Sequence, residues 1–129
     1  MHVEASTTVT PAAANRVRAF VRGFCRHSKG RWAGEPFDFT DRLWNDWVKP
    51  LYGWRRADGT RRFRDTFCFV PKKNGKSTTA GALTLYHLVA DNEPAPEVYG
   101  AAKNRQQAGI VYNESSLMVK SSPLLQRMC

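Results

Sequence analysis

Apolar residues recur with helical spacing early in the chain. They fall at i, i+3, i+4 and i+7, which places them on one face of a helix: Val17, Phe20, Val21 and Phe24. Thr10 followed by Pro11 is typical of a helix start, because a cap residue is followed by proline in the first turn. The pattern predicts an amphipathic helix beginning at Pro11, after a flexible leader of residues 1–10.

A second helix is predicted over residues 41–51, with Thr40 as its cap. Its apolar face carries Leu43, Trp44, Trp47 and Val48. Pro50 and Gly53 are expected to end it.

An Asp-Gly pair then predicts a β-hairpin. Asp58 and Gly59 lie between Trp54 and Phe63, a signal typical of a type I′ turn. Five arginines flank this turn: Arg55, Arg56, Arg61, Arg62 and Arg64.

The rest of the chain alternates between strand and helix patterns. Residues 65–70 (DTFCFV) and 97–101 (EVYGA) are short and rich in aromatic and β-branched residues, so both are predicted as strands, the first of them buried. Residues 76–90 are apolar on several sides and predict a helix buried against a sheet. Asn104 with Gln107 resembles a capping box that opens a helix to about Ser121, with a last helical turn from Ser122 and Pro123. The alternation favours an α/β fold.

Composition places the chain among globular proteins outside membranes. It has 129 residues and is 42% hydrophobic. No apolar run approaches the roughly 18 residues that span a bilayer, and the start lacks the basic and apolar blocks of a signal peptide. We expect a cytoplasmic protein with no membrane partner.

The net charge of +9 is concentrated in the first half of the chain. Residues 1–64 hold 13 Lys and Arg against 6 Asp and Glu, whereas residues 65–129 hold 7 against 5. A basic half suggests a polyanionic partner such as DNA, but basic residues also simply solubilise a surface. The same two interpretations apply to a basic stripe on the first helix, formed by Arg18, Arg22, Arg26 and Lys29.

Cysteine usage supports neither a disulfide framework nor a metal centre. Cys25, Cys68 and Cys129 are odd in number and far apart. Cys25 and His27 together supply too few ligands for zinc. Cys68 falls in the predicted strand and is expected in the core.

A phosphate-binding loop is predicted between the first of these strands and the helix that follows it. P-loops have the form G-x-x-x-x-G-K-[ST] between a strand and a helix. Residues 70–77 (VPKKNGKS) match the last three positions, with Val70 in place of the first glycine. An incidental surface turn is the alternative, which the flanking strand and helix disfavour.

The chemistry of such a loop assigns roles to its residues. Backbone N–H groups at the helix start favour negative charge, and Gly75 allows close approach to the phosphates. Lys76 supplies a charge to the β- and γ-phosphates, and the Ser77 hydroxyl can bind Mg²⁺. Lys72 and Lys73 would repel each other and Lys76 unless an anion such as a triphosphate lies between them. The alternative is that both side chains point into solvent.

Several stretches in order resemble the large subunit of tailed-bacteriophage terminases. They are KGRWAGEPF, LWNDWVKPLYGW, DGTRRFRDTFCFVPKKNGKST, EVYGAAKNRQQAGIVYNES and SSPLLQR. The resemblance as a whole covers most of the chain, roughly residues 11–128. The resemblance implies an incomplete P-loop ATPase core with a parallel sheet over residues 62–129. A helical segment with the basic hairpin, residues 11–61, would precede it.

The resemblance also implies roles for individual residues. Lys72 occupies the place of a basic residue thought to act as an arginine finger in cis, and it and Lys76 are the catalytic candidates. Asn45, after Trp44, occupies the place of a glutamine that reads adenine. The expected ATP-binding residues are Asn45, Pro71, Lys72, Lys73, Asn74, Gly75, Lys76, Ser77 and Thr78, with Ser77 as the Mg²⁺ ligand.

Parts of that family's machinery are missing from the sequence. It contains neither an apolar strand ending in Asp-Glu nor a carboxylate cluster for a two-metal nuclease. We therefore expect an N-terminal piece of a longer protein, with little or no turnover alone. We also expect it to be marginally stable, because its strands would leave edges unpaired.

The complete protein would be a ring-forming motor in the host cytoplasm that packages and cuts viral double-stranded DNA, working with a small subunit and a portal protein. Two alternatives stay open: another P-loop NTPase such as a helicase, and a non-enzymatic basic DNA-binding module whose Gly-Lys-Ser is incidental.

Overall fold

The computed structural model describes residues 8–27, 35–68, 76–91 and 94–128. The chain forms two compact units, each built from two separate stretches of sequence. Unit 1 combines Met1–Ala19 with Phe39–Phe69, and unit 2 combines Phe20–Asp38 with Val70–Cys129. The units therefore interleave in sequence, and each is described by itself.

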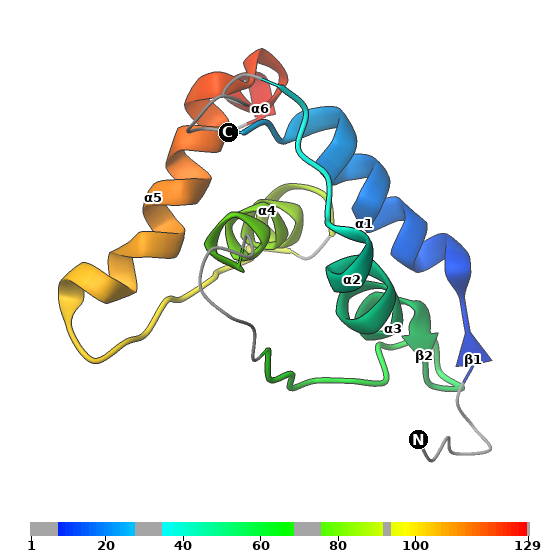
Figure 1. Cartoon of the computed structure of the whole chain (residues 1–129). Helices are drawn as coiled ribbons and strands as arrows, with labels where there is room; N and C mark the ends of the chain where they lie inside the picture. The colour runs from blue at the N-terminus through cyan, green and yellow to red at the C-terminus, as the bar shows by residue number, and fades with distance from the viewer. Residues whose placement is uncertain (1–7, 28–34, 69–75, 92–93, 129) are drawn as a thin grey trace. The chain divides into compact units, whose positions relative to one another are not determined.

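Unit 1 begins with a short strand and the start of a helix (Figure 1). β1 (Thr8–Val9) lies within the segment that was expected to be a flexible leader. α1 (Pro11–Phe24) begins at the predicted proline, and the Ala13 N–H donates to the Thr10 carbonyl. Val17 is fully buried, as the apolar pattern predicts.

The second predicted helix forms as one continuous helical run with an irregular middle. It consists of α2 (Asp41–Leu43), the π-helical turn η2 (Trp44–Val48) and α3 (Lys49–Gly53). Thr40 caps it as predicted, because its hydroxyl accepts from the Leu43 N–H at 3.3 Å. Pro50 was expected to end the helix and instead lies inside the run, whereas Gly53 does end it.

The π-turn explains why Pro50 is tolerated. The Lys49 N–H reaches back to the Trp44 carbonyl, one residue further than in an α-helix. This wider turn relieves the α-helical register just where proline supplies no N–H and its ring would crowd the preceding turn.

The predicted hairpin is present, with a different turn. β2 (Trp54–Arg55) pairs antiparallel with β1, and an isolated bridge joins Arg55 to Arg61. The Gly59 N–H donates to the Arg56 carbonyl and Gly59 has φ +87°, but Asp58 has no positive φ. A type I′ turn needs positive φ at both central residues, so that prediction is wrong. The loop follows the alternative three-residue pattern with glycine in the left-handed region.

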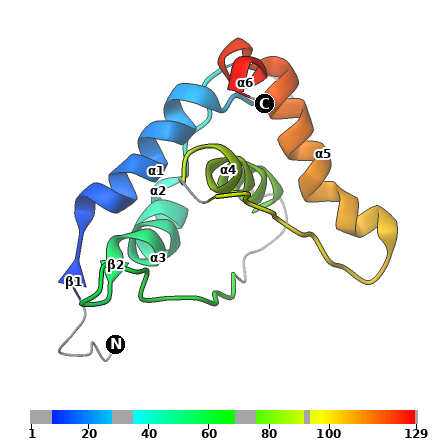
Figure 2. The same ribbon diagram turned by 180° about the vertical axis from the view of Figure 1, so that it is seen from behind.

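Unit 2 is helical in its described residues. α4 (Lys76–Val89), α5 (Arg105–Ser121) and α6 (Pro123–Met128) begin and end close to the predicted positions. Figure 2 shows α5 continuing into α6. Asn104 caps α5 by accepting from the Gln107 N–H at 2.9 Å, which is the first half of the predicted capping box.

The core of unit 2 forms between helices. α4 was expected to pack against a sheet, but it packs against α5, where the buried Ser115 hydroxyl donates to the Gly81 carbonyl at 3.0 Å. Phe20 from the end of α1 meets Tyr86 edge to face, with ring centroids 5.7 Å apart. Met118 and Leu125 are fully buried.

Neither predicted strand of the ATPase core forms in the described residues. Residues 65–68 and 97–101 adopt no regular structure, and Phe67 and Tyr99 are 86% and 83% exposed. Cys68 is half-buried rather than a core residue. A strand requires a neighbouring strand to accept and donate its backbone hydrogen bonds, and no strand pairing in the described ranges includes these segments. The sheet seen there is the antiparallel pair β1–β2, not a parallel one.

Candidate functional site

The first turn of α4 carries three of the predicted phosphate-binding residues. α4 begins at Lys76, whose side chain is exposed, and Ser77 and Thr78 follow half-buried. Its first turn contains no acidic residue. The first N–H groups of any helix lack intrahelical partners, and the helix dipole adds positive potential there. This end of α4 therefore suits an anion, which is the environment that the Gly-Lys-Ser motif requires.

The remaining loop residues lie outside the described part of the chain. They are Pro71, Lys72, Lys73, Asn74 and Gly75. The loop between strand and helix, and the finger role of Lys72, stay predictions.

A buried hydroxyl lies one turn into α4. Thr79 is 1% exposed, and among the described residues its Oγ1 has no hydrogen-bond partner. Leaving a hydroxyl unpaired costs about 1–3 kcal/mol, so such a group marks a place where a partner is needed. Sequence reasoning did not select Thr79, because in a single sequence nothing distinguishes it from the adjacent Thr78.

Asn45, the expected adenine-reading residue, lies in η2 of unit 1 with its side chain exposed. The preceding Trp44 is buried, stacked on Phe39 with ring centroids 6.1 Å apart, and the Arg18 guanidinium lies 4.6 Å from its ring centroid. Both neighbours anchor Trp44 in the core of its unit and leave Asn45 at the surface. α4 belongs to the other unit, so the role of Asn45 stays a prediction.

The basic stripe on α1 is partly compensated within the chain. Arg18 stacks on Trp44, and the Arg22 Nε lies 2.7 Å from a carboxylate oxygen of Asp38. Lys29 lies outside the described residues. These internal partners favour the interpretation of the stripe as a structural face over that of a DNA surface.

A metal centre formed by protein side chains is not found in the described ranges. No group of three or more His, Cys, Asp or Glu side chains gathers there in a way that could hold an ion. Cys25 is fully buried, and burial raises the pKa of its thiol to about 12.

None of the helices in the described ranges has the length and apolar character that crossing a bilayer demands.

Comparison with known proteins identifies the family to which the chain belongs. Residues 45–128, most of the sequence, match the family described as "Terminase large subunit, ATPase domain". The chain belongs to this family. It is 29% identical over 114 residues to the protein named "Terminase, large subunit" of Enterobacteria phage HK97. The match covers 88% of this chain and 21% of that relative, so the chain spans about a fifth of the relative's length. No solved structure matches it.

Proposed function

We propose that this chain supplies the ATP-binding part of a terminase large subunit, with residues 71–78 surrounding the phosphates. One observation carries the proposal: the Gly-Lys-Ser sequence meets the start of a 14-residue helix inside the segment that matches the ATPase domain. The matched family supports a nucleotide as the ligand. The exposed Lys76 and the lack of a carboxylate in the first turn support the position.

The chain's own residues would bind and orient the nucleotide. Gly75 would let the backbone approach, and the first N–H groups of α4 would donate to phosphate oxygens. Lys76 would place its ammonium group against the β- and γ-phosphates. Asn74 and Thr78, on either side of the Gly-Lys-Ser sequence, would complete the phosphate-binding residues. Lys72 and Lys73 would add positive charge, with Lys72 nearest in role to an arginine finger.

The Ser77 hydroxyl would hold Mg²⁺, which when bound neutralises charge on the phosphates. Hydroxyl oxygen is a ligand that Mg²⁺ accepts, and the half-buried position of Ser77 in the first turn of α4 is compatible with this role. Asn45 would bond the edge of adenine through its exposed amide.

The complete protein would use this site in a DNA-packaging motor. Hydrolysis of ATP would drive double-stranded viral DNA into a capsid through a portal protein, and a nuclease activity would cut the concatemer. A ring of large subunits and a small subunit would complete the assembly in the host or bacterial cytoplasm. This chain would contribute binding, with little or no turnover alone.

A substitution at Lys76 tests the site. We expect Lys76→Ala to abolish Mg·ATP binding in equilibrium titration calorimetry, because the charge facing the phosphates is removed. Lys120→Ala is the matched control, since Lys120 is also an exposed helical lysine but lies in the last turn of α5. Unchanged ATP binding by Lys76→Ala would refute the proposed site.

A further inference from the structure

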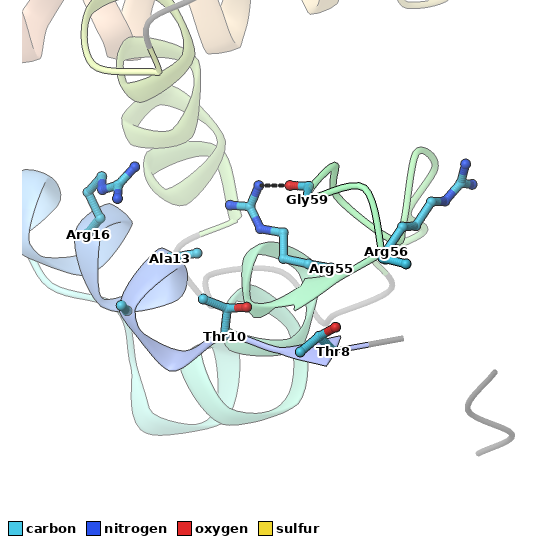
Figure 3. A pocket seen from close by; sticks show the side chains of 9 residues that line it. Thr8, Thr10, Ala13, Arg16, Arg55, Arg56 and Gly59 are labelled. Carbon is cyan, nitrogen blue, oxygen red and sulfur yellow. Dashed lines mark hydrogen bonds between the residues drawn. The ribbon is translucent and has the colours of Figure 1, made fainter. Parts of the chain in front are cut away.

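Unit 1 contains a basic pocket that the nucleotide site does not use. It has a volume of about 400 Å³ and lies where β1, the start of α1 and the hairpin meet (Figure 3). Thr8, Thr10, Arg16, Arg55 and Arg56 line it, together with alanine and glycine residues, and none of its lining residues is acidic. Its polar side chains are therefore hydroxyls and guanidinium groups.

Two of the arginines face the same space. Figure 3 shows Arg16 extending from α1 and Arg55 extending from β2 toward one another, whereas Arg56 extends away. Neither Arg16 nor Arg55 forms an ion pair with the described residues. The Arg55 Nη1 donates to the Gly59 carbonyl at 3.4 Å, which is a long hydrogen bond.

Arg55 has an unmet hydrogen-bond donor. Its Nε is buried and has no hydrogen-bond partner among the described residues. A buried donor on a charged group costs more when unpaired than a neutral one. An anionic oxygen in the pocket would satisfy it and would also compensate the charge of Arg16.

Backbone hydrogen bonds hold the pocket in shape. Thr8 is paired with Arg55 across β1 and β2, and the Thr10 N–H donates to the Gly53 carbonyl at 2.6 Å. The Arg56 N–H donates to the Thr60 carbonyl at 2.8 Å and closes the hairpin. The first turn of α1, which borders the pocket, contains no acidic residue. A pocket that is preorganised in this way loses little entropy when it binds an anion.

We propose that this pocket binds a phosphate group, and that the surrounding charge selects a phosphate of a nucleic-acid backbone over a free phosphate. Planar guanidinium groups match phosphate oxygens in geometry. The selection for a polymer is inferred from the hairpin, where Arg56 points out of the pocket and the sequence adds Arg61, Arg62 and Arg64. The Arg61 and Arg62 guanidinium groups lie over the rings of Tyr52 and Phe63, which does not neutralise their charge, whereas the Asp58 carboxylate offsets part of the charge of Arg56. A single phosphate would contact only the pocket, whereas a nucleic-acid backbone would also reach the arginines of the hairpin outside it.

The proposal is independent of the ATP site, because all lining residues belong to unit 1 and α4 belongs to unit 2. It is tested on the whole chain with a fluorescently labelled 20-base-pair DNA duplex and anisotropy over a range of salt concentrations. We expect Arg16→Ala and Arg55→Ala each to weaken binding about tenfold. Each should also reduce the slope of log affinity against log salt by about one.

Arg42→Ala is the matched control, because Arg42 is an exposed arginine of α2 that does not line the pocket. Arg16 is exposed on α1, so its removal leaves the core intact, and circular dichroism checks the fold of both variants. Arg55→Lys keeps the charge and is expected to recover only part of the lost affinity. Losses no larger than that of Arg42→Ala would overturn the site.

Two further arms separate the sources of phosphate. Inorganic phosphate should displace the duplex no better than sodium chloride does at the same ionic strength. Free phosphate would then act through ionic strength alone. The Lys76→Ala variant should bind the duplex normally, so that failure of the ATP site leaves this test intact. Pocket variants that lose ATP affinity and keep duplex affinity would contradict the selection for a nucleic-acid backbone.

Discussion

The hairpin of unit 1 and the two segments at residues 65–70 and 97–101 were all predicted as β-structure, and in the described residues only the hairpin forms. In the hairpin, Arg56 and Thr60 are four residues apart and bond to each other through their backbones. Within the described residues the other two segments take part in no strand pairing, and their large side chains Phe67 and Tyr99 are mostly exposed. The difference is the distance along the chain to the neighbour that each strand needs.

β-structure with a local partner therefore follows from a few residues of sequence, and β-structure with a remote partner does not. Strand propensity describes how well a residue fits a half-buried pleated surface, and that surface has to be supplied by other strands. Substitutions that disturb local and remote contacts separately test this difference.

The largest effect is expected where two remote segments do meet, at the contact of α4 with α5. A Cβ added at Gly81 would lie 3.1 Å from the Glu114 Cβ and 3.3 Å from the Ser115 backbone nitrogen. Gly81→Leu should therefore lower the free energy of unfolding by about 3 kcal/mol through overpacking. Urea denaturation measures this, with Gly109→Ala as the control, since a Cβ added at Gly109 would lie 4.0 Å from the Asn113 side-chain amide nitrogen. A loss below 1 kcal/mol would contradict the close packing.

A smaller effect is expected in the hairpin. Gly59 has φ +87°, so Gly59→Val should cost about 1–2 kcal/mol because a β-branched residue is strained there. Gly23→Ala is the comparison, because an added Cβ meets nothing within 4 Å and alanine favours the helix. Equal unfolding free energies for the two variants would show that the left-handed turn is not needed.

A pH effect is expected in the same turn. The Thr60 hydroxyl and N–H both donate to the Asp58 carboxylate and hold its pKa below the ordinary value of 3.8. The carboxylate therefore stabilises the turn fully above pH 3.8, and this contribution disappears as the pH falls through the lowered folded-state pKa. The amide shift of Thr60, followed by NMR from pH 6 to pH 2, should move with this titration. The Asp58→Asn variant should show no such titration. A wild-type midpoint above pH 3.8 would contradict the prediction, because it would mean that folding raises the pKa of Asp58.

The smallest effect is expected at an exposed side chain of residues 65–68, which form no strand. Because Phe67 is 86% exposed, Phe67→Ser should change the free energy of unfolding of this chain by less than about 0.5 kcal/mol. Chemical denaturation of the two chains side by side gives the difference. A loss above 2 kcal/mol would mean that Phe67 is buried in a strand.

The sequence predicts the helices well because their signals are local. Pro11 begins α1, the Thr40 hydroxyl caps α2, and the Asn104 amide oxygen caps α5. The exact turn of the hairpin was missed because Asp-Gly suits two turn types that differ in the φ of Asp58. Partners between distant residues were also missed, such as Arg22 with Asp38 and Ser115 with Gly81.

The two candidate sites also differ in whether their residues are close in sequence. Gly75, Lys76 and Ser77 are adjacent in sequence, so a motif selects them. The basic pocket combines Thr8 and Arg16 with Arg55, more than 35 residues further on, and only folding brings these together. The five hairpin arginines noted in the sequence include two residues of the pocket, Arg55 and Arg56. Arg16 was not predicted, because it lies outside the basic stripe on the first helix.

An NMR titration of the ¹⁵N-labelled chain with Mg·ATP shows directly whether the segment preceding α4 surrounds the phosphates of ATP. We predict that the largest amide shift changes fall on residues 72–78, with Gly75, Lys76 and Ser77 foremost, and that Lys76→Ala removes them. Changes confined to the amides around Arg16 and Arg55, or saturable changes that survive in Lys76→Ala, would contradict the account.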